Sequence, residues 1–129
     1  MANPNILNAT YAYGATTYLT PSATTAVVLL ANPAASNEVF KINSIVAANV
    51  NGSASVATTV AIYTNGAVAQ GSAPSGGTAF PLVSAVQVPA NASLIVVDKT
   101  TQLYLQEGTS IIVTSGTASG ITYLSLIHI

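Results

Sequence analysis

The sequence contains no cysteine and very little charge. Without cysteine the chain has no disulfides, no thiolate chemistry and no cysteine-ligated zinc, so packing or association between copies must supply its stability. Only 4% of the residues are charged, against about 25% in an average soluble domain. Two cations, Lys41 and Lys99, are too few to hold a phosphate backbone or an anionic membrane surface. We therefore expect no nucleic-acid partner and no membrane partner.

Long apolar runs are also missing. The longest run, residues 26–31, is far shorter than the roughly 18 residues of a membrane span. The first residues have neither the basic stretch nor the apolar stretch of a secretory signal. These features predict synthesis in a cytosol without secretion by that route.

Small residues dominate what is present. Alanine, serine, threonine and asparagine make up 61 of the 129 residues. Leucine, isoleucine, valine and phenylalanine still account for 36, which is more than the roughly 20% below which chains stay disordered. The net charge of -1 leaves little repulsion between copies, so the composition favours a folded domain that self-associates.

The apolar pattern predicts an all-β fold. Helical periodicity is absent, and short runs rich in β-branched residues alternate with Gly, Pro and Asn turns. So many short strands in one domain are typical of an antiparallel two-sheet sandwich of jelly-roll type. Residues 66–79 are rich in small residues and predict a long exposed loop. The expected strands cover residues 9–19, 25–30, 39–50, 54–63, 79–88, 94–97, 102–106, 110–114 and 121–124.

A hairpin is expected in the middle of the chain. Residues 51–53, Asn-Gly-Ser, suit a three-residue turn that pairs the two flanking strands directly. In that register Ile42 lies opposite Ile62, and Val46 lies opposite Thr58. A two-residue turn would place apolar residues opposite polar ones, so we expect the three-residue form.

The residues that catalysis requires are scarce. The chain has three carboxylates, Glu38, Asp98 and Glu107, and one histidine, His128. Each carboxylate lies in an expected turn or near a lysine, where solvation is the usual state. Two of the three would suffice for a glycosidase pair, but no spacing supports one, and His128 is close to the end of the chain, a poor place for a base. We expect no enzymatic activity, no catalytic residue, no metal and no cofactor.

Tyrosines are the best candidates for contact with a partner. Tyr11 and Tyr13 lie two residues apart, and therefore on one face of the first expected strand, while Tyr63 ends a later strand. Exposed tyrosines stack on sugar rings and anchor subunit interfaces, although tyrosine also packs commonly within sheets. Tyr11, Tyr13 and Tyr63 are therefore the candidate ligand or subunit contacts.

One stretch carries a family resemblance. Residues 104–113, Tyr-Leu-Gln-Glu-Gly-Thr-Ser-Ile-Ile-Val, precede a glycine-rich turn and the sequence Ile-Thr-Tyr-Leu at 121–124. This pattern resembles small virion structural proteins of tailed phages, particularly marine T4-like cyanophages, and residues 2–6 and 40–45 fit the same likeness. The resemblance implies a β-sandwich subunit that decorates a capsid or sits in a tail or neck appendage, usually as a symmetric homo-oligomer. Its motifs are strand–turn–strand patterns, and they carry over no functional residue.

The last five residues depart from that family pattern. There the last strand would continue into a serine-tyrosine-acidic stretch, whereas residues 125–129 read Ser-Leu-Ile-His-Ile. This ending resembles the translation of a sequencing adapter. We therefore expect one β-sandwich domain over residues 1–124 and a non-native tail at 125–129.

Two function classes follow from these observations. The first is a virion structural protein that acts by assembly, as a homotrimer or larger oligomer in contact with other virion proteins. The alternative is a carbohydrate-binding or adhesive module that contacts surface glycans through Tyr11, Tyr13 and the Asn- and Thr-rich loops. The mass of the protein in solution separates the two.

Overall fold

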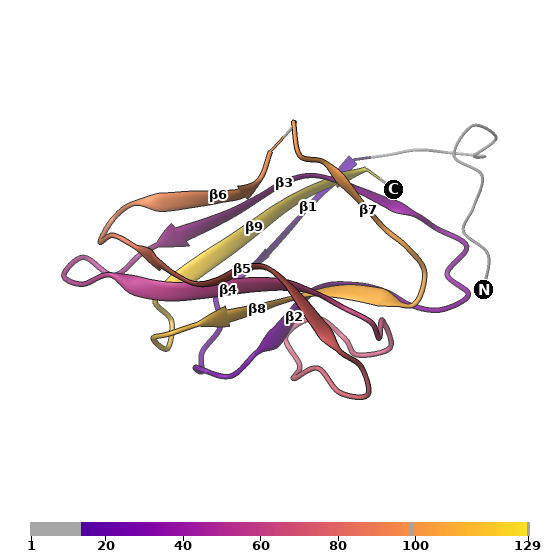
Figure 1. Ribbon diagram of the computed structural model, residues 1–129, viewed down its shortest axis with the longest axis horizontal. Helices are drawn as coiled ribbons and strands as arrows, with labels where there is room; N and C mark the ends of the chain where they lie inside the picture. Colours follow the sequence, from indigo (N-terminus) through magenta and orange to yellow (C-terminus); the bar gives the residue numbers. More distant parts are fainter. Residues whose placement is uncertain (1–13, 99, 129) are drawn as a thin grey trace.

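The computed structural model describes residues 14–98 and 100–128, with side chains described through residue 127. These residues form nine strands and no helix, in two antiparallel sheets that face each other (Figure 1). Sheet A, the upper layer of Figure 1, contains β1 (Gly14–Leu19), β3 (Phe40–Asn49), β6 (Ser93–Val97), β7 (Leu103–Leu105) and β9 (Ile121–His128). Sheet B, the lower layer, contains β2 (Val27–Asn32), β4 (Val56–Tyr63), β5 (Ala79–Val88) and β8 (Thr109–Ser115).

The strand order is that of a jelly roll. Sheet A runs β1-β9-β3-β6, with β7 beside the first part of β3, and sheet B runs β2-β8-β4-β5. The chain can be traced as one long hairpin whose arms pair β1 with β9, β2 with β8, β3 with β6 and β7, and β4 with β5. Rolling this hairpin adds the pairs β9–β3 and β8–β4 and closes the two layers. The predicted all-β sandwich with two antiparallel sheets is confirmed.

The expected central hairpin is wrong. β3 belongs to sheet A and β4 to sheet B, so the turn at residues 51–53 carries the chain across the sandwich. The buried side chain of Asn49 stabilises this crossing, because its Nδ2 donates to the carbonyls of Ala54 at 3.0 Å and Val88 at 2.8 Å. Its Oδ1 accepts from the backbone N–H of Asn51.

A β-bulge in β3 also changes which residues face the core. The register with β9 shifts between Ile42 and Ser44, so Asn43 is the extra residue. Beyond this point Ile45 and Ala47 are buried, and Val46 lies on the opposite, outer side. A strict two-residue alternation from Ile42 places Val46 on the wrong face.

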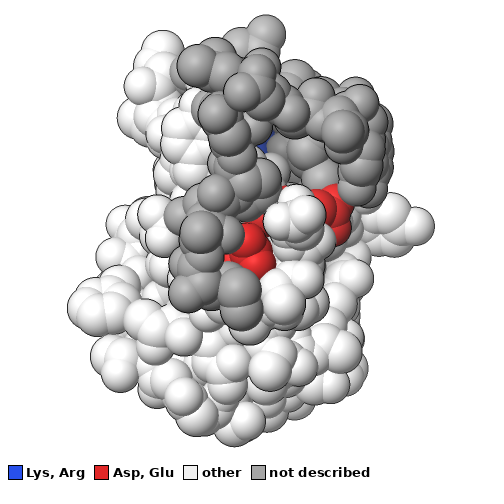
Figure 2. All heavy atoms as spheres, turned by 90° about the vertical axis from the view of Figure 1, so that its right-hand side faces the viewer, with Lys and Arg blue, Asp and Glu red and all other residues white. Residues whose placement is uncertain are grey.

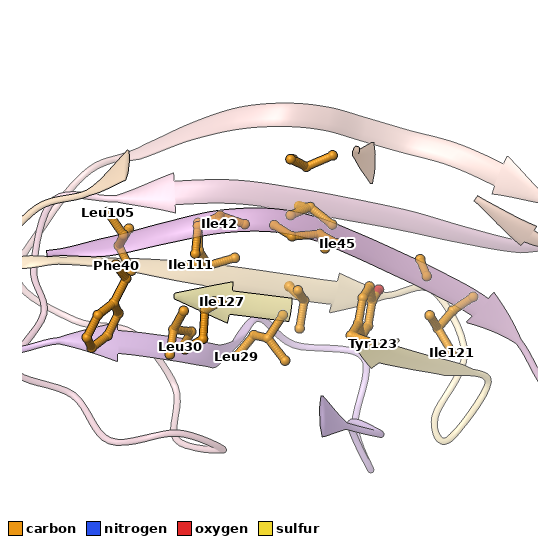
Figure 3. Packing of buried hydrophobic residues seen from close by; sticks show 14 of the residues in the cluster. Leu29, Leu30, Phe40, Ile42, Ile45, Leu105, Ile111, Ile121, Tyr123 and Ile127 are labelled. Carbon is orange, nitrogen blue, oxygen red and sulfur yellow. The ribbon is translucent and has the colours of Figure 1, made fainter. Parts of the chain in front are cut away.

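Side chains from both sheets fill a single main core between the layers (Figure 3). Tyr123 of β9 is fully buried and reaches from sheet A to sheet B, where its hydroxyl is hydrogen-bonded to Thr58 and donates to the carbonyl of Thr114 at 2.9 Å. The largest aliphatic side chains that are fully buried in this core are Leu29, Ile42, Ile45, Leu105, Ile111, Ile121 and Ile127.

The expected domain end at residue 124 falls inside a strand. β9 continues through His128, and both Ser125 and Ile127 are buried. Ile127 pairs with Ala15 of β1 and Ile42 of β3. The inward positions of β9 continue beyond residue 124 with the same period of two, so residues 125–128 belong to the sheet.

Candidate interaction surfaces

Sheet B has an apolar row on its outer face, and the chain itself covers that row. Val28, Ile112 and Ala61 lie side by side on β2, β8 and β4, and none is more than 6% exposed. Residues 64–78 fold over them, and Val68 packs on the cluster. We call Val28, Ile112 and Ala61 the covered row.

Backbone and side-chain hydrogen bonds fix the loop of residues 64–78 in place. Its backbone extends sheet B beyond β2, since Val28 donates to the carbonyl of Ser72 at 2.9 Å and accepts from Gly71 at 2.8 Å. Many loop side chains are exposed, as expected, but the backbone is attached to the edge of the sheet, beside β2 in Figure 1.

Tyr63, one of the predicted contact residues, belongs to this attachment. Its side chain is 8% exposed and packs in the cluster under the loop. Its hydroxyl accepts a hydrogen bond from the backbone N–H of Gly77 at 2.9 Å. Tyr63 therefore packs the fold and presents little surface to a ligand or subunit. The other two candidates, Tyr11 and Tyr13, lie outside the described residues.

Sheet A has a matching row on its outer face, and that row is exposed. Tyr18 pairs with Leu124, Leu124 with Val46, and Val46 with Ile95, which joins β1, β9, β3 and β6 in one line. Tyr18 is 70% exposed, Leu124 40% and Ile95 61%, while Val46 is half-buried. We call these four residues the open row. No segment among the described residues covers it in the way that residues 64–78 cover sheet B.

The surroundings of the open row carry almost no charge. On one side lies the cross-strand line of Thr16, Leu126 and Ser44, and on the other Ala48 with its partners. Of the charged residues that the structure describes, only Lys41 lies in a strand of sheet A. Figure 2 shows the end of the molecule on the right of Figure 1, where acidic side chains appear as two red patches. Such a face is compatible with an apolar or small polar partner and offers little to a charged one.

A second exposed apolar patch lies on β5, an edge strand of sheet B. Phe80, Leu82 and Val86 have exposed side chains, and we call them the β5 patch. The register of β5 against β4 shifts twice, and Ala85 has a φ of 51°, in the left-handed region that favours glycine. Its N–H donates to Thr59 Oγ1 at 2.9 Å.

Pro81 and the two irregularities interrupt the hydrogen-bonding edge of β5. Proline has no N–H to donate, and a bulge twists the strand away from a flat ladder. Contact with β5 would therefore use its side chains more than its backbone.

Two of the scarce ionisable residues, Asp98 and His128, occupy structural positions. Asp98 closes the turn after β6, where its Oδ1 accepts from the N–H of Thr100 at 2.8 Å and from the hydroxyls of Thr100 and Thr101. These hydrogen bonds, chiefly those from Thr100, lower the pKa of Asp98 below its ordinary value. His128 pairs through β9 with Gly14 and Lys41. Within the described residues no three potential metal ligands come together.

Comparisons with known proteins assign no family. No protein-family model, curated protein or solved structure matches the chain. The described part of the chain has no helix that is long and apolar enough to cross a membrane. The open row and the β5 patch are therefore the features of this chain from which a function can be inferred.

Sequence reasoning missed the open row, although a signal for it exists. Antiparallel sheets with one solvated face alternate apolar and polar residues, but β9 is apolar on both faces at Tyr123, Leu124, Leu126 and Ile127. That double pattern indicates a strand with a second face that needs covering. Which other residues share the outer face depends on strand pairing across more than 100 residues.

Proposed function

We propose that this protein is a non-enzymatic structural subunit of a phage virion, a capsid decoration or a tail or neck appendage that acts by self-assembly. The observation that carries the proposal is the open row, an uncharged apolar line across four of the five strands of sheet A. Exposed apolar patches on this scale commonly mark protein contacts. The resemblance to virion proteins is the reason for placing this subunit in a phage particle.

The fold suits a building block. Jelly-roll sandwiches occur in viral capsid proteins and in lectins, and they present broad sheet faces held rigid by a shared core. This chain has two separate apolar surfaces, the open row and the β5 patch. Two surfaces let each copy contact two neighbours, which is what an assembly of more than two copies requires.

The alternative, a carbohydrate-binding module, receives less support. Tyr18 and Tyr104 are exposed tyrosines on sheet A, as sugar stacking would require. However, the cross-strand neighbour of Tyr18 is Leu124, an aliphatic residue that cannot hydrogen-bond a sugar hydroxyl. A glycan array whose hits disappear in the Tyr18→Ala and Tyr104→Ala variants would favour this alternative.

Light scattering over a wide concentration range tests the proposal. A structural subunit is expected as a defined multiple of the 12.9 kDa chain, with three or more copies in each particle. A protein that stays monomeric at the highest concentration contradicts the proposal. Antibody labelling of purified phage particles then tests the location, and a defined oligomer that is missing from every particle would reject the virion assignment.

A further inference from the structure

We infer that the outer face of sheet A is an interface between two copies of this chain, with the open row of one copy packed against the open row of the other. This inference rests on the proposed function, because it names the surface and the partner through which assembly occurs. It depends on three observations: the covered row, the distribution of charge and the size of the face.

The covered row shows how this fold treats an apolar line on an outer sheet face. Val28, Ile112 and Ala61 are at most 6% exposed because residues 64–78 pack on them. The open row has larger side chains, and none of the described residues covers it as residues 64–78 cover the other row. An equivalent cover from outside the described chain would remove a comparable apolar area from water.

The distribution of charge indicates a second copy as the cover. An average protein surface would bring charged side chains onto the open row, where no opposite charge is available to compensate for their desolvation. The same face of a second copy brings two charges near it among the described residues. Lys41 lies five positions along β3 from Val46 and thus roughly 17 Å away. Asp98 lies in the turn after β6, three positions from Ile95 and thus roughly 10 Å away, where Thr100 and Thr101 hydrogen-bond its carboxylate. Because an interface related by a two-fold axis uses the same patch twice, an uncharged apolar row satisfies both partners.

The size of the face sets the expected strength of the contact. The four strands are five to ten residues long and spaced by about 4.8 Å, so the face spans about 19 by 25 Å, or about 470 Å² for each copy. A standard stable interface buries roughly 800 Å² on each partner. We therefore expect a contact that dissociates on dilution unless the β5 patch adds to it.

Substitution of a lysine into the open row tests the inference. Ile95→Lys and Leu124→Lys place a charge on the face, at positions already exposed in the monomer. Each variant should reduce the number of copies per particle at least twofold by light scattering, with an unchanged far-UV spectrum. Val50→Lys is the matched control, because Val50 is also an exposed aliphatic residue but lies beyond the end of β3, and it should leave the mass unchanged.

Phe80→Lys in the β5 patch separates failure of the inference from failure of the proposed function. A wild-type oligomer that withstands both open-row substitutions and dissociates with Phe80→Lys overturns the inference and leaves self-assembly intact. A wild-type protein that is monomeric at every concentration contradicts both. If that monomer loses stability on Ile95→Lys, the open row is covered by another part of the same chain.

Discussion

The outer faces of both sheets carry an apolar row, but the chain covers only one of the two rows. Each has an apolar row across three or four strands, at paired positions of adjacent strands. On sheet B the chain covers the row with its own residues 64–78, whereas on sheet A the row is exposed. Exposure of the open row is therefore specific to sheet A, because the covered row shows that this fold can enclose an apolar line on an outer sheet face.

The largest expected effect comes from displacing the loop over the covered row. Gly66 is buried, and a Cβ at this position would overlap the carbonyl oxygen of Asn32 and lie 2.8 Å from that of Thr109. Backbone atoms cannot move aside as a flexible side chain can. Gly66→Ala should therefore lower the free energy of unfolding by about 3 kcal/mol, measured by urea denaturation.

Gly66→Ala should also make the two faces alike, because the detached loop would expose the covered row. Increased binding of a hydrophobic dye is the expected sign. Gly52→Ala is the matched control: the nearest atoms to its Cβ are those of Asn91 at 3.9 Å, and stability should change by less than about 0.5 kcal/mol. Equal losses in the two variants would show that the tight fit of Gly66 does not hold the loop.

Threonine substitutions compare the two rows directly. Ile112→Thr places a hydroxyl in the covered row and removes buried aliphatic volume, so we expect a loss of about 2 kcal/mol. Leu124→Thr makes a similar change in the open row, where the side chain is already partly hydrated, and should cost less than about 0.5 kcal/mol in the monomer. Chemical denaturation of dilute protein measures both. Similar losses at the two positions would mean that the open row is also covered.

The sequence was sufficient to predict where the strands lie, but not which strands pair with one another. Alternation and turn residues predict a strand at 79–88, and β5 covers those residues. The Asn-Gly pair at 51–52 indicates a turn, but it does not say whether the chain returns to the same sheet or crosses to the other. The bulge at Asn43 depends on pairing with β9, far away in the sequence, and local alternation cannot detect it.

The same limit applies to the candidate surfaces. Tyr63 lies at the end of a predicted strand, and it is buried by its cluster with Val68 and by the return of Gly77 onto its hydroxyl. The open row draws its residues from four strands between Tyr18 and Leu124. No short window of sequence contains such a surface, because it exists only after the jelly roll has closed.

The next prediction concerns the hydroxyl of Tyr123, whose hydrogen bonds join sheet A to sheet B and hold the two layers in one sandwich. Tyr123→Phe removes the hydroxyl that bonds Thr58 and the carbonyl of Thr114. The loss of these buried hydrogen bonds should cost about 1.5 kcal/mol. A loss below about 0.3 kcal/mol would show that apolar packing alone joins the layers.

The stability of the wild type should also respond to alkaline pH through Tyr123. Burial raises the pKa of this tyrosine above its ordinary value of 10.0, and the hydrogen bond with Thr58 offsets the rise only in part. A group whose pKa is higher in the folded state contributes its full stability below the unfolded value and loses it as the pH rises towards the folded value. The stability difference between wild type and Tyr123→Phe should therefore shrink above about pH 10, as followed by urea denaturation at several pH values. A difference that stays constant with pH would contradict the burial of the hydroxyl.

The smallest expected effect tests how the loop is attached to the covered row. Tyr63→Phe keeps the ring in place and removes only the acceptor for the Gly77 N–H, so we expect a loss of about 0.5 to 1 kcal/mol. Tyr18→Phe in the open row is the matched control and should change stability less, because that side chain is largely in water. Amide hydrogen exchange should accelerate at Gly77 in Tyr63→Phe and remain unchanged there in Tyr18→Phe. If exchange also accelerates at Gly71, whose N–H donates to Val28, the loop is released as one unit. The hydroxyl of Tyr63 then helps to hold the loop over the covered row, which is what makes the two outer faces different.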